Sequence, residues 1–177
     1  MTVWGSLVQT TVIIDGSGEL DGNLKLFGGT AGDTLTGGDG NDWLFGGLGG
    51  DSLTGGAGGD TFYYETAAQS SSAAYDTLVQ FDDAVDTIDL VGLTVSEFAG
   101  PLSGTLDAAT LGTQLEAAAG TLGTGQALVF SANAGTLNGQ TFLLIDGNGT
   151  AGYQANGDFL IALASPVGAI DNLGMFI

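Results

Sequence analysis

Large apolar residues recur at every ninth position in one stretch of the chain. They are Leu35, Leu44, Leu53 and Phe62, and each is the middle residue of three that follow an aspartate. Successive side chains of a strand point to opposite faces, so only the middle residue of the three faces inward. The pattern predicts one turn and one short strand in every nine residues, and two such units complete one coil of a flattened right-handed roll.

Four consecutive copies of the pattern fill residues 28–63: GGTAGDTLT, GGDGNDWLF, GGLGGDSLT and GGAGGDTFY. Each begins with Gly-Gly, and its sixth residue is Asp33, Asp42, Asp51 or Asp60. Glycine permits a tight turn with positive φ and leaves the carbonyl groups accessible. Ala31 is a departure, because the other copies have glycine at the fourth place.

An eighteen-residue coil stacks Asp33 with Asp51 on one edge of the roll, and Asp42 with Asp60 on the other. Carboxylates roughly 4.8 Å apart, the strand spacing, repel each other unless a cation lies between them. The chain has no histidine or cysteine, so the ligands are hard oxygen atoms and the expected cation is calcium. A flexible Gly-Asp linker is the alternative, but a linker would not keep a large apolar residue at every ninth position.

The repeat is similar to the calcium-binding nonapeptide of RTX proteins. A later segment, AYDTLVQFDDAVDTIDLVGL (74–93), resembles the C-terminal regions of serralysin proteases and the R-modules of mannuronan epimerases. In those families the roll continues into a β-sandwich. The matching residues are Asp76, Phe81, Asp86, Ile88, Asp89 and Leu90, whereas Gln80 and Gln69 stand where acidic residues are usual.

The resemblance implies calcium sites in which backbone carbonyl groups complete the shell around two carboxylates. The first site joins one turn to the turn stacked on it, through Gly28, Thr30, Asp33, Gly47, Gly49 and Asp51. The second site likewise joins Gly37, Asp39, Asp42, Gly56, Gly58 and Asp60. Further candidate ligands are Asp76, Asp86 and Asp89, for which solvated or turn-capping carboxylates are an equal alternative.

The predicted fold is all-β: a parallel β-roll of nonapeptide repeats that continues into a β-sandwich with one short helix. Residues 1–27 are expected to form N-terminal cap strands, from the β-type runs 7–14 and 24–27. Residues 28–63 form the roll and residues 64–177 the sandwich, as one continuous folding unit. A helix is predicted over 107–119, with Asp107 as N-cap and Gly120 as its end, and strands over 127–131, 141–145 and 159–164.

The outward positions of the roll differ between its two sheets. One sheet presents Thr34, Thr36, Ser52 and Thr54, and the other presents Trp43, Phe45, Thr61 and Tyr63. An exposed aromatic face is unusual for a monomer. We therefore expect the C-terminal segment or a partner to cover it.

Composition narrows the possible partners. The 177 residues include 20 acidic side chains and one base, Lys25, for a net charge of −19, yet 44% are hydrophobic. Such a negatively charged surface repels nucleic acid and anionic membranes. A chain with this high a fraction of hydrophobic residues is not expected to be disordered. No apolar run approaches the ~20 residues of a membrane span, and no N-terminal signal peptide is apparent.

Catalysis is not expected. Without histidine or cysteine, a His-based triad, a thiol nucleophile and the usual zinc sites are excluded. A carboxylate pair for glycoside hydrolysis is formally possible, but the aspartates occupy metal positions. In the loop 146–158, Asp146, Asn148 and Asp158 are candidates for another calcium, although ordinary turn chemistry is favoured.

The predicted function is a calcium-binding domain of a secreted or cell-surface protein that folds on meeting extracellular calcium. The C-terminal DNLGMFI resembles the uncleaved signal of type I secretion substrates, which makes the type I secretion machinery a predicted partner; it also fits a last core strand. Two other functions stay open: a self-associating surface-layer or adhesin module, and a calcium-dependent carbohydrate-binding module for a polysaccharide.

Overall fold

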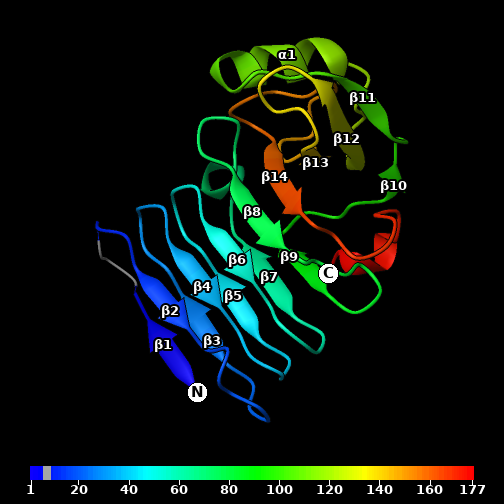
Figure 1. Ribbon diagram of the computed structural model, residues 1–177. Coiled ribbons are helices and arrows are strands. Elements are labelled where there is room, and N and C mark those ends of the chain that lie inside the picture. Colours follow the sequence, from blue (N-terminus) through cyan, green and yellow to red (C-terminus); the bar gives the residue numbers. More distant parts are fainter. Residues whose placement is uncertain (6–8) are drawn as a thin grey trace.

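The computed structural model describes residues 1–5 and 9–177. It is built from two long sheets, which we call sheet A and sheet B (Figure 1). Sheet A has the order β1-β3-β5-β7-β9. Sheet B has the order β10-β12-β13-β14-β8-β6-β4-β2, with β11 added beside β12. The fold class predicted from the sequence is confirmed, since strands dominate and one short α-helix is present.

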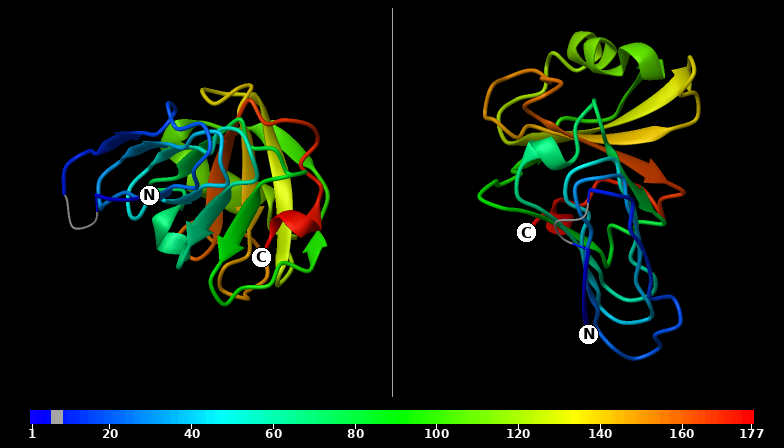
Figure 2. Two further views of the ribbon diagram at one scale, coloured as in Figure 1. Left: turned by 90° about the horizontal axis from the view of Figure 1, so that it is seen from below. Right: turned by 90° about the vertical axis from the view of Figure 1, so that its left-hand side faces the viewer.

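The strands of the roll alternate between the two sheets. In sheet A they are β1 (Thr2–Trp4), β3 (Lys25–Phe27), β5 (Trp43–Phe45), β7 (Thr61–Tyr64) and β9 (Thr87–Leu90); in sheet B they are β2 (Ile13–Asp15), β4 (Thr34–Thr36), β6 (Ser52–Thr54) and β8 (Asp76–Val79). Neighbouring strands of the roll are parallel. Figure 2 shows the roll as a narrow, flattened stack with the N-terminus at its free end.

Each repeat buries its eighth residue, as the periodicity predicts. The exposed fractions of Leu35, Leu44, Leu53 and Phe62 are at most 1%. Burying a side chain of this size contributes roughly 1.5–3 kcal/mol, so each repeat adds to the roll's stability through its inward residue. The column continues through Leu26 at one end and through Leu78 and Ile88 at the other.

The first 27 residues supply the first three strands of the stack. Leu26 is fully buried, as expected from its place in a degenerate repeat. Of the predicted strand over 7–14, residues 7 and 8 lie outside the described residues. For residues 9–14 the prediction is too long, because residues 9–12 are not in a strand and β2 begins only at Ile13.

The segment 74–93 forms the last coil of the roll. Its two strands do not pair with each other: β8 lies in sheet B beside β6, and β9 lies in sheet A beside β7. Beyond β8, sheet B passes directly into β14 (Phe159–Ala164), β13 (Thr141–Ile145) and β12 (Gln126–Ala134). The short strands β10 (Glu97–Phe98) and β11 (Leu102–Thr105) complete it.

The β12–β14 part of sheet B is buried on both faces. On one face, Leu143, Ile145 and Ile161 join the core of the roll. On the other face, Phe142 and Leu144 pack in a second core with Leu115 of α1 (Leu111–Ala118). Alternate residues of β13 therefore serve two cores, which explains why the strand is apolar from Phe142 to Ile145.

The predicted helix over 107–119 is present but starts late. Its first turn is the 3₁₀ helix η2 (Ala108–Thr110), and the α-helix begins at Leu111. Asp107 occupies the N-cap position of η2, as predicted, but its side chain makes no capping hydrogen bond there. Its Oδ1 accepts from the amide of Thr136 at 2.8 Å instead, which ties the helix start to the loop after β12.

The C-terminal segment runs along the edge of sheet A. After η3 (Leu173–Met175), Phe176 bridges Ile88 in parallel, and the amide of Leu90 donates to the carbonyl of Ile177 at 3.3 Å. Met175 is buried in the core. The segment thus lies beside β9 and does not lie over the aromatic face, contrary to one of the two expectations for that face. No described helix is long and apolar enough to cross a membrane.

Candidate metal centre

Two rows of aspartates run along the edges of the roll. Because β4 and β6 pair in register, Asp33 and Asp51 precede adjacent strands at the same height. The amide of Asp33 donates to Oδ1 of Asp51 at 2.7 Å, and the amide of Asp51 donates to Oδ1 of Asp76 at 2.8 Å. We call Asp33, Asp51 and Asp76 the first ladder.

The opposite edge carries the second ladder, formed by Asp42, Asp60 and Asp86. The amide of Asp42 donates to Oδ1 of Asp60 at 2.8 Å, and the amide of Asp60 donates to Oδ1 of Asp86 at 3.0 Å. All six carboxyl groups are buried. One oxygen of each aspartate is therefore committed to holding successive coils together.

The second oxygen differs between members of the ladders. Asp33 and Asp42 each accept with Oδ2 from the second-place glycine amide of their own turn, Gly29 and Gly38. Oδ2 of Asp86 accepts from the amide of Asp82 at 2.9 Å. In contrast, Oδ2 of Asp51, Asp60 and Asp76 is buried without a hydrogen-bond partner.

The backbone conformation of the turns also differs between the first two repeats and the last two. In the third and fourth repeats, the second-place glycines Gly47 and Gly56 have φ of 97° and 113°. The equivalent Gly29 and Gly38 are not among the positive-φ glycines, and neither is Ala31 among the non-glycine residues with positive φ. The alanine that interrupts the glycine pattern therefore stands where an L-residue is tolerated.

The carboxyl groups without a partner are electrostatically unfavourable as anions. Burial raises the pKa of Asp51 to about 6, with the charge of Asp33 adding to it. Burial raises the pKa of Asp60 to about 7, with the charges of Asp86 and Asp42 adding to it. For Asp76 burial and the charge of Asp51 raise the pKa well above its ordinary value. Buried anions of this kind require a counter-charge or a proton.

The residues present fit a hard divalent cation. The oxygens without a partner are carboxylate oxygens that lie against the backbone of first-place glycines. Any side chain at these glycines would collide with them: a Cβ on Gly46 would lie 2.2 Å from Oδ2 of Asp51, and one on Gly55 would lie 2.0 Å from Oδ2 of Asp60. No three acidic side chains converge anywhere in residues 1–5 and 9–177. Any cation here would therefore depend on backbone carbonyls for most of its ligands, as calcium tolerates.

The structure brings together the turns that were expected to share each site. The turn of Gly28, Thr30 and Asp33 is bonded to that of Gly47, Gly49 and Asp51 through the amide of Leu48 and the carbonyl of Gly29, at 3.0 Å. The turn of Gly37, Asp39 and Asp42 is bonded to that of Gly56, Gly58 and Asp60 through Ala57 and Gly38, at 2.9 Å. Asp89 is separate, since it pairs with Tyr63 inside sheet A.

Sequence reasoning missed several groups at these edges. Asn23 accepts with its side chain from the amide of Asn41 at 3.1 Å, and Asn41 accepts from the amide of Gly59 at 2.9 Å. The signal was asparagine directly before the sixth place in two units 18 residues apart, which stack on each other. The hydroxyl of Tyr64, fully buried and without a hydrogen-bond partner, was also missed. The Tyr64 pKa is raised by burial first, and then by the charge of Asp76, by the approach of its hydroxyl to the Asp76 carboxyl group and by the charge of Asp51. The same approach lowers the Asp76 pKa, against the larger effect of burial, although it falls short of hydrogen-bond geometry.

Gln69, noted as a departure from the family pattern, has a structural task. Its Oε1 accepts from the amides of Glu65 and Thr66 at 2.6 and 3.1 Å and caps η1 (Ala67–Gln69). Next to it, Ser70 donates from Oγ to the carbonyl of Leu160 and accepts from the amide of Asp76 at 2.9 Å. The first ladder is thereby joined to β14.

The loop 146–158 has its carboxylates saturated by hydrogen bonds. Asp146 accepts from the amides of Gly125, Asn148 and Gly149, and Asp158 accepts from the amides of Gly147 and Gln154 and from the Asn148 side chain. These are turn-stabilising bonds that leave no carboxylate oxygen without a donor, in agreement with the favoured turn chemistry.

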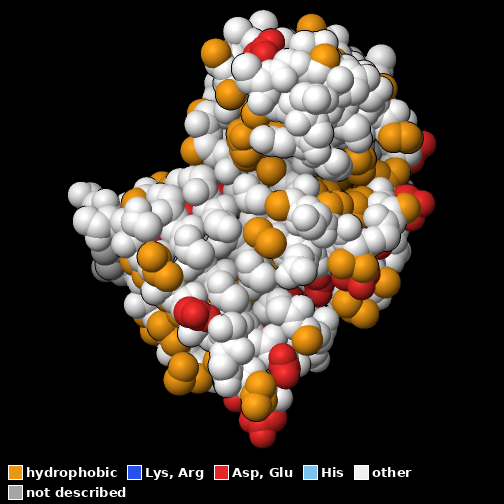
Figure 3. Space-filling view, viewed as in Figure 1, with side chains coloured by type: hydrophobic (Ala, Val, Ile, Leu, Met, Phe, Trp, Pro, Cys, Tyr) orange, Lys and Arg blue, Asp and Glu red, His pale blue; other side chains and the backbone are white. Residues whose placement is uncertain are grey.

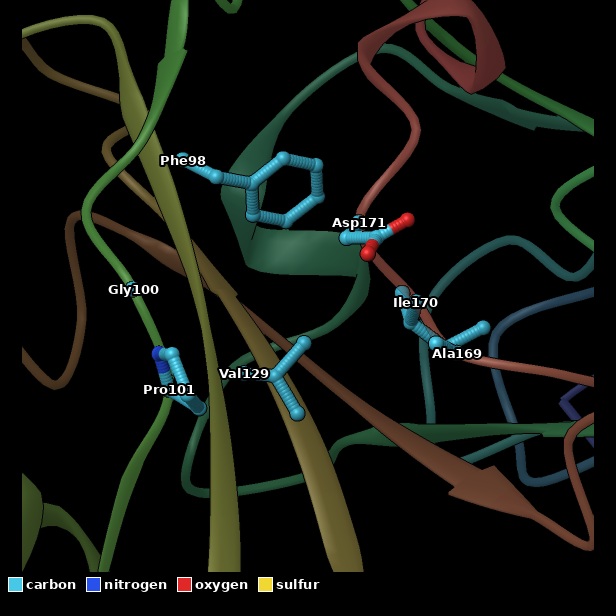
Figure 4. A pocket seen from close by; sticks show the side chains of 7 residues that line it. All are labelled: Phe98, Gly100, Pro101, Val129, Ala169, Ile170 and Asp171. Carbon is cyan, nitrogen blue, oxygen red and sulfur yellow. The ribbon is translucent and has the colours of Figure 1, made fainter.

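An apolar cavity of about 280 Å³ lies between β12 and the C-terminal segment. Figure 4 shows Phe98, Val129 and Ile170 around it, with Asp171 at its edge. Asp171 is the one titratable residue of its lining.

Comparison with known proteins places the chain among RTX-type domains. The family model described as "Peptidase M10 serralysin C terminal" matches residues 10–161. Among solved structures, the solution structure of the AlgE6R3 subunit from the Azotobacter vinelandii mannuronan C5-epimerase is similar, with a TM-score of 0.54 and 24% identity. That match covers 98% of this chain and 82% of the other, and supports the fold. No curated protein sequence matches the chain.

Proposed function

Because the chain belongs to the serralysin C-terminal family, we propose that it is a calcium-binding β-roll domain whose folding calcium completes. The observation that carries the proposal is the set of three buried carboxylate oxygens without a partner, on Asp51, Asp60 and Asp76. Burial has raised the pKa of all three carboxyl groups, so each lacks the counter-charge that it needs as an anion.

Two calcium sites lie between stacked turns in this proposal. Asp33 and Asp51 supply the carboxylates of one, and Asp42 and Asp60 those of the other. Carbonyl groups at the first and third places of the earlier turn and the second and fourth places of the later turn complete each shell. Asp76 extends the first ladder with a further oxygen that accepts no hydrogen bond. Both oxygens of Asp86 accept hydrogen bonds, and so do both oxygens of Asp33 and Asp42, so at these residues calcium would take the place of an amide donor. Asp89 is not included, because it lies away from both ladders.

Calcium would supply positive charge at buried carboxylates. Extracellular calcium modules bind at roughly 10⁻⁴ to 10⁻³ M, so cytosolic calcium would leave such sites empty. At a hundredfold excess over Kd, one site adds about 2.7 kcal/mol to the free energy of unfolding. Two sites reach the lower end of a domain's total stability, about 5 kcal/mol. The metal is therefore sufficient to decide whether the roll is folded.

Secretion through a type I pathway is part of the proposal. In the folded chain, the C-terminal residues are engaged: Asp83 accepts from the amides of Asp171 and Asn172 at 3.2 and 3.1 Å, and Met175 is buried. A signal in this segment would be accessible only while the chain is unfolded. Folding that waits for extracellular calcium would keep it accessible until export. No catalytic activity is proposed for the chain.

Calorimetric calcium titration tests the proposal. We expect about two sites with Kd near 10⁻⁴ to 10⁻³ M. Asp60→Ala should remove the second site, and the matched control Asp89→Ala, an aspartate off the ladders, should leave both. An absence of binding heat at about 10 mM calcium, or equal effects of the two variants, would refute it.

A further inference from the structure

The outer face of sheet A carries a continuous row of aromatic rings. The four sheet A strands β1, β3, β5 and β7 contribute Trp4, Phe27, Trp43 with Phe45, and Tyr63. Sequence reasoning found the last three of these rings. Trp4 and Phe27 join them because β1 and β3 pair in register, with Trp4 opposite Phe27. We call these five rings the aromatic stripe.

Each ring of the stripe contacts the next. Trp4 and Phe27 stack with centroids 3.8 Å apart and an interplanar angle of 10°. Phe27 lies 5.1 Å from Trp43, and Trp43 lies 4.5 Å from Tyr63. Phe45 lies 5.7 Å from Tyr63. Such contacts hold the rings in place without covering their outer faces.

The stripe belongs to neither hydrophobic core. None of its rings is among the residues packed in or against the two cores. Trp4 is 64% exposed, and the other four rings are partly exposed. The C-terminal segment pairs at the edge of the sheet instead, next to β9. The described chain therefore leaves the stripe open to a partner.

Polar groups border the stripe. The hydroxyls of Thr61 and Thr87 lie 3.1 Å apart beside it. Lys25, the single base of the chain, places Nζ 5.8 Å from the centroid of Trp43. Asp89 is paired with Tyr63 and ends the stripe at β9. The stripe is therefore a row of flat apolar rings with hydrogen-bond donors and acceptors along its sides.

Charge limits what can occupy this face. The chain carries a net charge of −19, so a second copy or an anionic polymer would approach against strong repulsion. Figure 3 shows acidic and no basic side chains in view; it is therefore not the face on which Lys25 lies over the stripe. An uncharged polymer meets no such barrier. Equatorially linked sugar rings present flat C–H faces and carry hydroxyls at their rims, which matches apolar rings bordered by polar groups.

We propose that the aromatic stripe binds a neutral polysaccharide of equatorially linked pyranose rings. The sugar rings lie on the aromatic rings along the row, and their hydroxyls meet Thr61, Thr87, Lys25 and Asp89. The proposal is independent of the aspartate ladders, which lie at the edges of the roll and take no part in sugar contact. It assigns calcium only the role of keeping the roll folded.

Calorimetry with three uncharged oligosaccharides, cellohexaose, β-1,4-mannohexaose and fully N-acetylated chitohexaose, tests the proposal in about 10 mM calcium. Trp43→Ala with Phe45→Ala removes two rings. The matched control is Ser52→Ala with Thr54→Ala, at the same repeat positions on sheet B. Circular dichroism and calcium titration of each variant verify that the roll and its metal sites are intact.

We expect at least one oligosaccharide to bind, and its affinity to fall by about tenfold or more in the ring variant but not in the control. Trp43→Phe with Phe45→Tyr should retain most of the affinity, and about 0.5 M sodium chloride should change it little. An absence of binding to all three sugars, or equal loss in both double variants, would overturn the proposal. So would a calcium-dependent dimer that the ring variant abolishes, since the stripe would then bind a second copy.

Discussion

The amide of Asp51 donates to Oδ1 of Asp76 at 2.8 Å, while Oδ2 of both residues is buried without a hydrogen-bond partner. The two residues are 25 positions apart and lie in adjacent coils of the roll. One oxygen of each carboxylate thus holds the coils in register, and in our proposal the other binds the cation. The residues that align the coils are therefore also the ones whose buried charge is unfavourable.

Replacing Asp76 by asparagine separates these two tasks. Asparagine retains the Oδ1 acceptor and removes the charge. In chelator at pH 8 we expect Asp76→Asn to raise the free energy of unfolding by about 1 kcal/mol or more, because a buried carboxylate no longer has to ionise or bind a proton. In calcium the same variant should gain less stability from the metal than the wild type. Urea unfolding under both conditions measures this, with Asp89→Asn as control. Destabilisation in chelator would contradict the role given to Asp76.

Stability without calcium should fall as the pH rises. The folded-state pKa values of Asp51 and Asp60 are raised to about 6 and about 7, above the roughly 3.9 of an unfolded aspartate. Between these values the folded chain binds more protons than the unfolded chain, so raising the pH from about 4 to about 7 lowers the free energy of unfolding. Urea midpoints in chelator across this range measure the effect. Stability that rises over this range in chelator would show that these carboxyl groups are not strained.

Calcium should weaken or abolish that decline. It competes with protons for the same carboxylates, so its binding strengthens as the pH rises. The same unfolding series in about 10 mM calcium provides the comparison.

The C-terminal segment should contribute to stability through Met175. This side chain is 1% exposed in the core of the roll, and the next residue, Phe176, bridges Ile88. Met175→Ala should lower the free energy of unfolding in calcium by about 2–5 kcal/mol. Ile177→Ala, at a side chain that is 62% exposed, is the control and should cost much less. Equal, small losses would mean that the segment is not part of the folded core.

The roll was predictable from the sequence because its rules are local. A strand of three residues with one inward position leaves Leu35, Leu44, Leu53 and Phe62 as the only consistent core, and the structure buries all four. The strands 141–145 and 159–164 were also predicted with the observed bounds, since apolar runs bounded by turn residues mark buried strands.

Features set by distant contacts were not predictable in the same way. The placement of β8 and β9 in different sheets depends on pairing with β6 and β7. Asp107 is a residue type that commonly caps helices, but its carboxylate accepts a hydrogen bond from the amide of Thr136, 29 residues later. Trp4 enters the aromatic stripe through pairing with a strand more than twenty residues away. In each case the structure depends on a contact with a residue far away in the sequence, which the local pattern of residues does not contain.

Far-UV circular dichroism during a calcium titration, from chelator to about 10 mM, tests the central claim most directly. The account predicts a cooperative gain of β-sheet signal in the wild type and a shift of that transition to higher calcium in Asp42→Ala, which removes one carboxylate of the second site. A spectrum that is fully folded in chelator, with a thermal midpoint that calcium does not raise, would contradict it.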